Sequence, residues 1–150
     1  MSSFSFNIQG AKELDNALKS LGIELETKIA RSAVRAGAVV IKNRAVELAP
    51  MGSDGVADGT LKRSIQVVMR SKKVGDAVAS IVTRTGKKYA AKGMNAFYAS
   101  EVEFGTKYRR ATPFMRPALD SQGQTAVKRM SEVIQKRIAF FARKAAKSGH

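Results

Sequence analysis

The strongest structural signal in the sequence is a helical stripe that runs without a break from about Glu24 to Ala49. Its apolar residues recur at steps of three and four, the spacing that places side chains on one face of an α-helix; they are Leu25, Ile29, Ala33, Ala36, Val40, Ile41, Ala45 and Leu48. Pro50 ends the helix, because a proline forces the preceding residue out of helical geometry. Such a helix measures about 39 Å at ~1.5 Å per residue, which is long for a chain of 150 residues.

The middle of this predicted helix lacks bulky side chains. Gly37 lies there among Ala33, Ala36 and Ala38, and a glycine costs a helix about 1 kcal/mol relative to alanine. Two interpretations are open. The site is either a place where the backbone of a neighbouring element or subunit comes close, or simply an alanine-rich stretch of helix.

A second helical stripe follows the prolines of the last third of the chain. Pro117 suits the first position of a helix, where its missing N–H is not needed. The apolar stripe that follows consists of Leu119, Ala126, Met130, Val133, Ile134, Ile138, Phe141 and Ala145. Most lysine and arginine residues lie off this stripe, so we predict an amphipathic helix with a basic outer face.

Between the two long helices the sequence predicts an antiparallel hairpin. Ile65, Val67 and Met69 form one side of a first strand with a period of two, and residues 77–83 repeat this period after a Gly-Asp turn. The predicted fold is therefore α+β: long N-terminal and C-terminal helices packed on a small antiparallel sheet of three or four strands.

The length of the chain favours a single domain over residues 1–150. It begins with an N-terminal segment at 1–10, and a short helix is predicted over Ala11–Leu21. Residues 51–60 and 85–95 contain glycine and polar residues and are predicted to be flexible loops.

The charge of the chain is strongly unbalanced, with 27 Lys and Arg against 12 Asp and Glu and a net charge of +15. Residues 1–50 carry 7 basic and 5 acidic side chains, residues 51–100 carry 9 and 3, and residues 101–150 carry 11 and 4. This excess predicts attraction to polyanions, either nucleic acid or acidic protein surfaces. No segment resembles a signal peptide or the ~20 apolar residues of a membrane span, so we expect no membrane contact.

Side chains that catalyse reactions or bind metals are scarce. The chain has no cysteine, and its one histidine is the C-terminal residue. The nearest approach to a site is Glu101 and Glu103, which in an extended segment would point the same way and could form a carboxylate pair or a divalent-ion site. Pairing with Arg109, Arg110 or Arg116 is the interpretation that we favour. We expect no enzymatic activity, no metal and no cofactor.

Aromatic and basic residues are interleaved around residue 100. The aromatic residues are Phe97, Tyr98, Phe104, Tyr108 and Phe114. They could stack on single-stranded nucleic acid, but we favour a role in the core where the sheet meets the last helix. Seven basic residues are candidates for contact with DNA or a partner protein, with simple solvation as the alternative: Lys72, Lys73, Lys87, Lys88, Lys92, Arg109 and Arg110.

Several short motifs, taken in order, resemble one known family. They are Gly10 with Leu14 and Leu18, Leu48-Ala49-Pro50, Asp58-Gly59-Thr60-Leu61-Lys62-Arg63-Ser64-Ile65, Tyr98-Ala99, Val102-Glu103-Phe104-Gly105-Thr106 and Pro113-Phe114-Met115-Arg116-Pro117-Ala118. In this order the chain resembles the tail-component or tail-completion family of lambda-like long-tailed phages, the gene-ten-like proteins found beside head–tail connectors. The last two motifs are the most specific.

The residues of these two motifs are the candidate structural site. They are Glu103, Phe104, Gly105, Thr106, Pro113, Phe114, Arg116 and Pro117. Gly105 would permit a turn conformation that other residues cannot adopt, and Phe104 and Phe114 would anchor that turn in the core. Pro113 and Pro117 would stiffen the start of the last helix.

The resemblance implies a structural virion protein, a tail-completion or head–tail joining subunit located in the tail or neck. It implies a homo-oligomer, expected to be a hexameric ring, with a tail terminator or tail-tube protein and the head–tail connector as partners. Packaged DNA is a further expected contact, and loops 51–60 and 85–95 are expected to become ordered on assembly. The alternative is a nonspecific nucleic-acid-binding protein.

Overall fold

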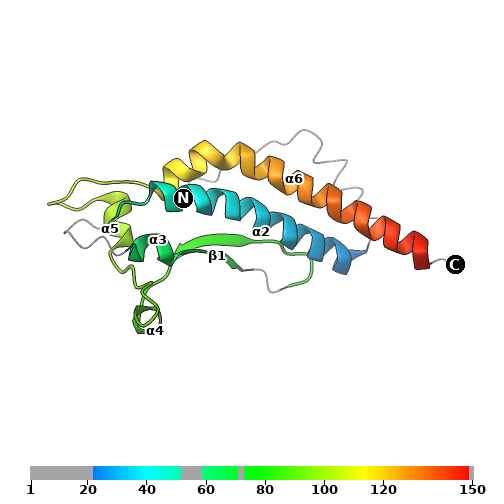
Figure 1. Cartoon of the computed structure of the whole chain (residues 1–150), viewed down its shortest axis with the longest axis horizontal. Helices are drawn as coiled ribbons and strands as arrows, with labels where there is room; N and C mark the ends of the chain where they lie inside the picture. Colours follow the sequence, from blue (N-terminus) through cyan, green and yellow to red (C-terminus); the bar gives the residue numbers. More distant parts are fainter. Residues whose placement is uncertain (1–21, 52–58, 71–72, 149–150) are drawn as a thin grey trace.

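The structure is a computed structural model that describes residues 22–51, 59–70 and 73–148. The predicted helix at 11–21, the N-terminal segment and residues 52–58 of the first predicted loop lie outside these residues. The described elements, in chain order, are α2 (Ile23–Leu48), α3 (Thr60–Ser64), β1 (Ile65–Met69), β2 (Ala79–Thr83), α4 (Lys87–Ala90), α5 (Ala99–Phe104) and α6 (Met115–Ser148) (Figure 1).

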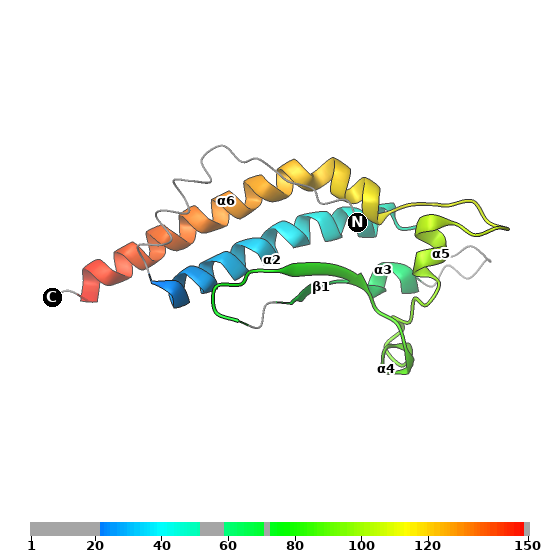
Figure 2. The ribbon, with the colours of Figure 1, turned by 180° about the vertical axis from the view of Figure 1, so that it is seen from behind.

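The first long helix, α2, confirms the prediction from the apolar stripe. It has 26 residues and begins after Gly22, whose φ of 86° is open to glycine without a steric penalty. It ends at Leu48, and Ala49 already has extended backbone ahead of Pro50. Helix α2 forms the middle layer of the molecule, with α6 on one side and the β1–β2 hairpin on the other (Figures 1 and 2).

The contact between α2 and α6 explains the small residues in the middle of α2. Gly37 and Ala33 are buried, and a Cβ atom added to Gly37 would lie 2.6 Å from Cγ of Met130 and 3.1 Å from the carbonyl oxygen of Ala126. The two helices therefore approach closely at Gly37, which confirms the first of the two interpretations: the neighbouring element is α6 of the same chain.

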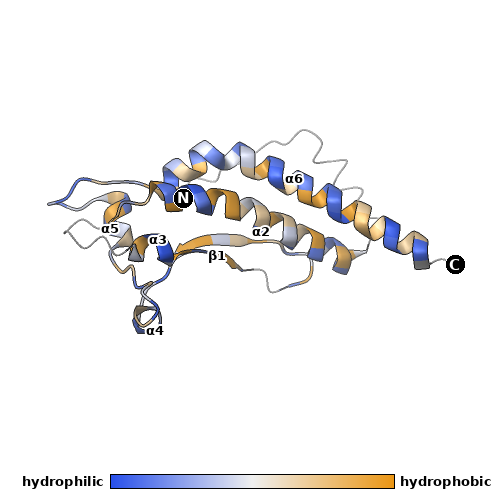
Figure 3. Cartoon of the chain, in the orientation of Figure 1, coloured by the Kyte–Doolittle hydropathy of each residue, from blue (hydrophilic) through white to orange (hydrophobic). Residues whose placement is uncertain are grey.

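Helix α6 has 34 residues, about 51 Å at ~1.5 Å per residue. Apolar and polar residues alternate in patches along it (Figure 3). Its basic residues Lys128, Arg129, Lys136, Arg143 and Lys147 are exposed, as predicted for an amphipathic helix with a basic outer face. The helix begins at Met115, two residues before Pro117, so this proline is third in the helix and not first.

The sheet is an antiparallel hairpin whose register pairs Ile65 with Thr83, Val67 with Ile81 and Met69 with Ala79. We expected three or four strands, and the described part of the chain contains two. Residues on one side of this hairpin, including the buried Ile65, face α2. The α+β fold class, with two long helices and a small antiparallel sheet, is confirmed.

The turn of the hairpin is fastened to the first half of α2. Arg31 donates hydrogen bonds from Nε to the carbonyl oxygen of Asp76 at 3.1 Å and from Nη2 to that of Lys73 at 2.8 Å. The backbone N–H of Gly75 donates to Oγ1 of Thr27 at 2.8 Å. The hairpin therefore runs alongside α2, with its turn near the N-terminal end of that helix.

The main core lies at the opposite end of α2. One cluster of buried side chains there consists of Ala45, Ala49, Leu61, Ile65, Ala96, Ala99, Val102, Phe114 and Ala118. Phe114 is the largest of these side chains and is 1% exposed. Because α2, α3, β1, α5 and α6 all contribute, this cluster fixes the position of the segment between α5 and α6.

Residues 85–95, which we predicted to be a flexible loop, contain the short helix α4 (Lys87–Ala90). The segment is closed by hydrogen bonds from the N–H of Gly86 to Oδ1 of Asn95 at 2.8 Å and from the N–H of Met94 to the carbonyl oxygen of Tyr89 at 3.0 Å. Nε of Arg63 also donates to the carbonyl oxygen of Gly93 at 3.1 Å. The sequence pattern missed these bonds because a four-residue helix leaves no periodic signal.

Candidate functional site

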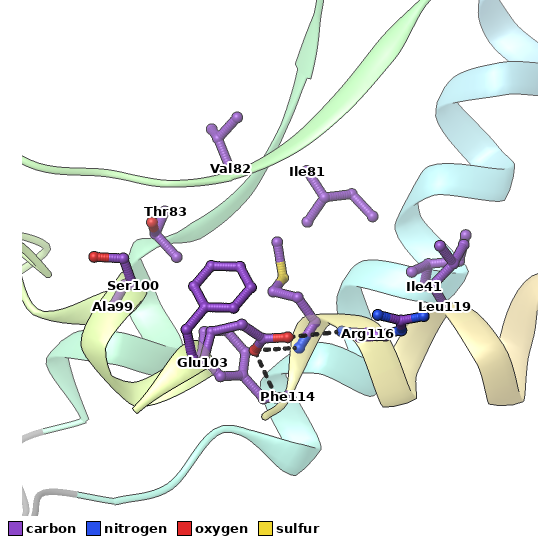
Figure 4. Close-up of a pocket in the computed structure, with 12 residues that line it drawn as sticks. Ile41, Ile81, Val82, Thr83, Ala99, Ser100, Glu103, Phe114, Arg116 and Leu119 are labelled. Atoms are coloured by element: carbon purple, nitrogen blue, oxygen red, sulfur yellow. Dashed lines mark hydrogen bonds between the residues drawn. The ribbon is translucent and has the colours of Figure 1, made fainter. Parts of the chain in front are cut away.

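The candidate site is the corner of the chain formed by α5, the loop at 105–114 and the first turn of α6. The carboxylate of Glu103 on α5 accepts three backbone hydrogen bonds at the start of α6. Its Oε2 accepts from the N–H of Phe114 at 2.8 Å and of Met115 at 3.0 Å, and its Oε1 accepts from the N–H of Arg116 at 3.0 Å (Figure 4).

This carboxylate caps the N-terminus of α6. The first N–H groups of a helix have no partner within the helix, and a negative charge there interacts favourably with the helix dipole. Glu103 provides acceptors for the N–H groups at 114, 115 and 116, and Pro117 has no N–H to satisfy. The proline and the glutamate together leave this helix start with no unpaired donor among residues 114–117.

The pair of glutamate side chains that an extended segment would allow is not formed. Residues 99–104 are helical and not extended, so positions 101 and 103 point about 200° apart around the helix axis. Glu101 is exposed to solvent, whereas Glu103 turns toward α6. The partners of Glu103 are main-chain N–H groups and not the guanidinium groups that we favoured.

Gly105 makes the turn that leaves α5. Its φ is 75°, and a Cβ atom there would lie 2.7 Å from the backbone nitrogen of Ala111 and 3.0 Å from the carbonyl oxygen of Arg109. Both the conformation and the space therefore require glycine. The expectation that Gly105 forms a turn closed to other residues is confirmed.

Thr106 closes the loop that follows. Its N–H donates to the carbonyl oxygen of Arg109 at 2.9 Å, and its Oγ1 accepts from the N–H groups of Tyr108 at 3.2 Å and Arg109 at 3.1 Å. The N–H of Thr112 then returns to the carbonyl oxygen of Val102 at 2.8 Å. The loop projects from one end of the molecule (Figure 1).

The aromatic residues of this region divide into two groups. Phe114 is buried and Tyr98 packs against the core, as we expected. Phe104 is 81% exposed, Tyr108 is 90% exposed and Phe97 is 74% exposed, so the prediction that Phe104 anchors the turn is wrong. The reason is helical geometry: Ala99 and Val102 face the core from α5, and Phe104 follows Val102 by two positions, on the far side of the helix.

An open, largely apolar groove lies beside the corner. Its volume is about 670 Å³, and it lies between α2, β2, α5 and the start of α6 (Figure 4). We call it the corner groove; it is lined by Ile41, Ile81, Val82, Thr83, Ala99, Ser100, Glu103, Phe104, Phe114, Met115, Arg116 and Leu119. No sequence pattern predicts this groove, because its walls come from four separate elements that meet only in the folded chain.

The basic candidates do not form one patch. Lys87, Lys88 and Lys92 are exposed on and after α4, and Arg109 and Arg110 are exposed in the loop that follows α5. These two groups lie toward the same end of the molecule (Figure 1). Lys73 is exposed in the hairpin turn, beside the first half of α2, and Lys72 lies outside the described residues.

Two other kinds of feature, a metal site and a membrane-spanning helix, are absent from the described ranges. No three or more His, Cys, Asp or Glu residues there are grouped so that they could hold a metal ion. In the same part of the chain, no helix is long and apolar enough to cross a membrane.

The comparison with protein families gives one match. The model described as "Bacteriophage HK97-gp10, putative tail-component" matches residues 12–105. These residues include α2, the hairpin, α5 and the Glu103-Phe104-Gly105 part of the corner. No significant match was found among curated proteins or among solved structures.

Proposed function

The chain belongs to the HK97-gp10-like family of bacteriophage tail components, and from this premise we propose that it is a tail-completion or head–tail joining subunit. In this role the protein acts by binding copies of itself and neighbouring virion proteins, and it carries out no catalysis. The observation on which the proposal depends is the family match over residues 12–105, which is more than half of the chain.

Two features of the surface support binding as the mechanism. Phe97, Phe104 and Tyr108 have exposed aromatic side chains. Phe104 lines the corner groove, Phe97 precedes α5, and Tyr108 lies in the loop that follows α5. Exposed aromatic residues are enriched where proteins bind one another. The rigid turn at Gly105 and the capped start of α6 hold the Tyr108 loop and Phe104 in a defined geometry, which lowers the entropy lost on binding.

We propose a homo-oligomeric ring, with six subunits as the expected number, placed in the tail or neck between the head–tail connector and the tail terminator or tail-tube protein. Native mass spectrometry of the purified protein, followed by electron microscopy, tests the ring. We expect a closed six-membered species. A chain that stays monomeric at high micromolar concentration, alone and with its neck or tail partners, would contradict the proposal.

A genetic experiment tests the position in the virion. A phage with a stop codon early in this gene should assemble filled heads and separate tails that fail to join, and a plasmid copy of the gene should restore whole particles. Normal joined particles from the mutant phage would rule out the joining role. Electron micrographs of the lysates distinguish these results.

Packaged DNA is a second partner that the charge of the chain supports. The exposed lysines of α4 and the arginines at 109 and 110 lie toward one end of the subunit, where they could line the channel of a ring. If nonspecific DNA binding were the main activity, affinity for duplex DNA should fall roughly 10³- to 10⁵-fold between 50 and 200 mM salt for 6–10 phosphate contacts. A subunit that acts mainly by assembly should form its oligomer over the same range of salt.

A further inference from the structure

The free edge of β2 borders the corner groove. The N–H groups of Arg70 and Arg84 donate to the carbonyl oxygens of Val78 and Ser64, at 2.8 and 2.9 Å. In an antiparallel pair, hydrogen-bonded and non-hydrogen-bonded positions alternate. The register therefore turns the N–H and C=O groups of Ala79, Ile81 and Thr83 away from β1, and within the described residues no further strand lies beside them.

This edge is suited to receive another strand. Ile81 and Thr83 also line the corner groove, together with apolar residues of α2 and α6 such as Ile41 and Leu119. A strand laid along β2 would satisfy the outward backbone groups, and its alternate side chains would enter the groove. The occupant must therefore be an extended segment in which large apolar residues alternate with small polar ones.

The chain itself contains such a segment outside the described residues. In Ser3-Phe4-Ser5-Phe6-Asn7-Ile8, large apolar and small polar residues alternate strictly. The first ten residues carry no charged side chain, in a chain whose net charge is +15. The segment is thus chemically matched to an apolar groove, and no like charge of its own opposes docking on this basic protein.

The length of the intervening chain is sufficient. Thirteen residues separate Ile8 from Gly22, and they span between about 20 Å as a helix and about 43 Å as an extended chain. Gly22 lies at the end of α2 where the hairpin turn is fastened, and β2 runs from that turn toward Ile41, about 27 Å along α2 from Ile23. The linker reaches every point of the β2 edge.

We propose that Phe4–Ile8 docks on the free edge of β2 of its own chain as a third strand and fills the corner groove. Because the linker arrives from the turn end of the hairpin, the segment runs antiparallel to β2. Phe4 then lies opposite Thr83, Phe6 opposite Ile81 and Ile8 opposite Ala79. In this register the three apolar side chains lie on the same face as Ile81, toward the groove.

The proposal can be tested with engineered cysteines, since the native chain contains none. In the proposed register, Asn7 and Ser80 form a non-hydrogen-bonded pair, with Cα atoms about 4.5 Å apart, within the range that a disulfide spans. The N7C/S80C double variant should therefore form a disulfide within one chain on mild oxidation, seen as a monomer that migrates faster on a non-reducing gel and carries the linked peptide in mass spectrometry.

The matched control is the N7C/V68C double variant. Val68 lies opposite Ser80 on β1, one strand further away, at a distance of roughly 9–10 Å from position 7, which is too far for a disulfide. Cross-linking in this control would place the segment on the other edge of the hairpin and overturn the proposal. Disulfide-linked dimers of N7C/S80C would show that the segment docks on a second copy, which would overturn the proposal. The absence of any disulfide in N7C/S80C would overturn the proposal as well.

A second measurement avoids oxidation altogether. F6S should lower the midpoint of thermal unfolding by about 4 °C or more, because it removes the central apolar side chain from the groove. S5A, which alters a side chain on the opposite face of the proposed strand, should leave the midpoint within about 1 °C. Equal midpoints for F6S and the native chain would contradict the proposal. The inference concerns the single chain, so it stands or falls independently of ring formation.

Discussion

At the scale of single residues, the corner depends on one carboxylate and one glycine. Glu103 caps helix α6, which begins twelve residues later in the chain, through three backbone hydrogen bonds of 2.8–3.0 Å. Gly105 supplies the turn that carries the chain back to those N–H groups. Each residue therefore has a role that neighbouring residues of similar chemistry, such as Glu101, do not share.

Replacing Glu103 by alanine should destabilise the fold by about 1–3 kcal/mol, because the N–H groups of Phe114, Met115 and Arg116 lose their acceptor. The matched control is Glu101→Ala on the same helix, where the side chain is exposed; it should change stability by less than about 0.5 kcal/mol. Urea unfolding followed by circular dichroism measures both values. Equal effects of the two substitutions would argue against the capping role.

Gly105→Ala should destabilise the fold more than Gly75→Ala. Both glycines have positive φ, 75° and 93°, so both substitutions carry a conformational cost. Gly105 also has a ψ of 174°, a combination that is essentially restricted to glycine and costs another residue roughly 1–3 kcal/mol. At Gly75 nothing lies within 4 Å of the added Cβ, whereas at Gly105 the backbone nitrogen of Ala111 lies 2.7 Å away. Equal unfolding free energies for the two variants would contradict the tight turn at Gly105.

At the scale of elements, the long helices and the strands could be predicted from the sequence because their apolar residues repeat at regular spacing. The short helices could not. The bounds of α2, the hairpin strands and the basic face of α6 followed from repeated spacing over many residues. Helix α5 has six residues, too few to show a helical period, so the sequence leaves an extended segment at Glu101 and Glu103 open and wrongly predicts that Phe104 is buried. The groove and the Glu103 cap could not be predicted, because both arise only when distant segments meet.

The close contact between α2 and α6 at Gly37 gives a further prediction. Gly37→Ala brings a Cβ atom within 2.6 Å of Cγ and 2.8 Å of Sδ of Met130, which offsets the ~1 kcal/mol that alanine gains over glycine in a helix. In a Met130→Ala background this clash is gone. Gly37→Ala should therefore be more favourable there, by at least about 1 kcal/mol, than in the native background. Additive effects in the double-mutant cycle would show that the helices are not this close.

At the scale of the whole molecule, the two ends of the elongated chain differ. One end carries the main core, the corner groove, α4 and the projecting loop at 105–114 (Figure 1). At the other end, α6 runs on past the start of α2. In the proposed ring, the two ends of each subunit would meet different surroundings. One end would face the channel or one partner, and the other end would face a different partner or the solvent.

Tyr108→Ser tests whether the exposed aromatic surface serves assembly. The side chain is 90% exposed and does not line the corner groove, so the unfolding free energy should change by less than about 0.5 kcal/mol, while self-association should weaken at least tenfold if this residue lies in the ring contact. Val78→Ser, at a 51% exposed position near the hairpin turn, is the control. Native mass spectra that are unchanged for Tyr108→Ser would remove this residue from the proposed interface.

The cap that joins Glu103 to the start of α6 also has a kinetic consequence. Its partners are only 11 to 13 residues apart in sequence, so closing this loop costs the unfolded chain far less entropy than bringing together Gly37 and Met130. Short-range closures form early during folding and long-range ones late. We expect the corner to act as a nucleus that is in place before the two long helices find each other, and substitutions at Glu103 to slow refolding more than they speed unfolding.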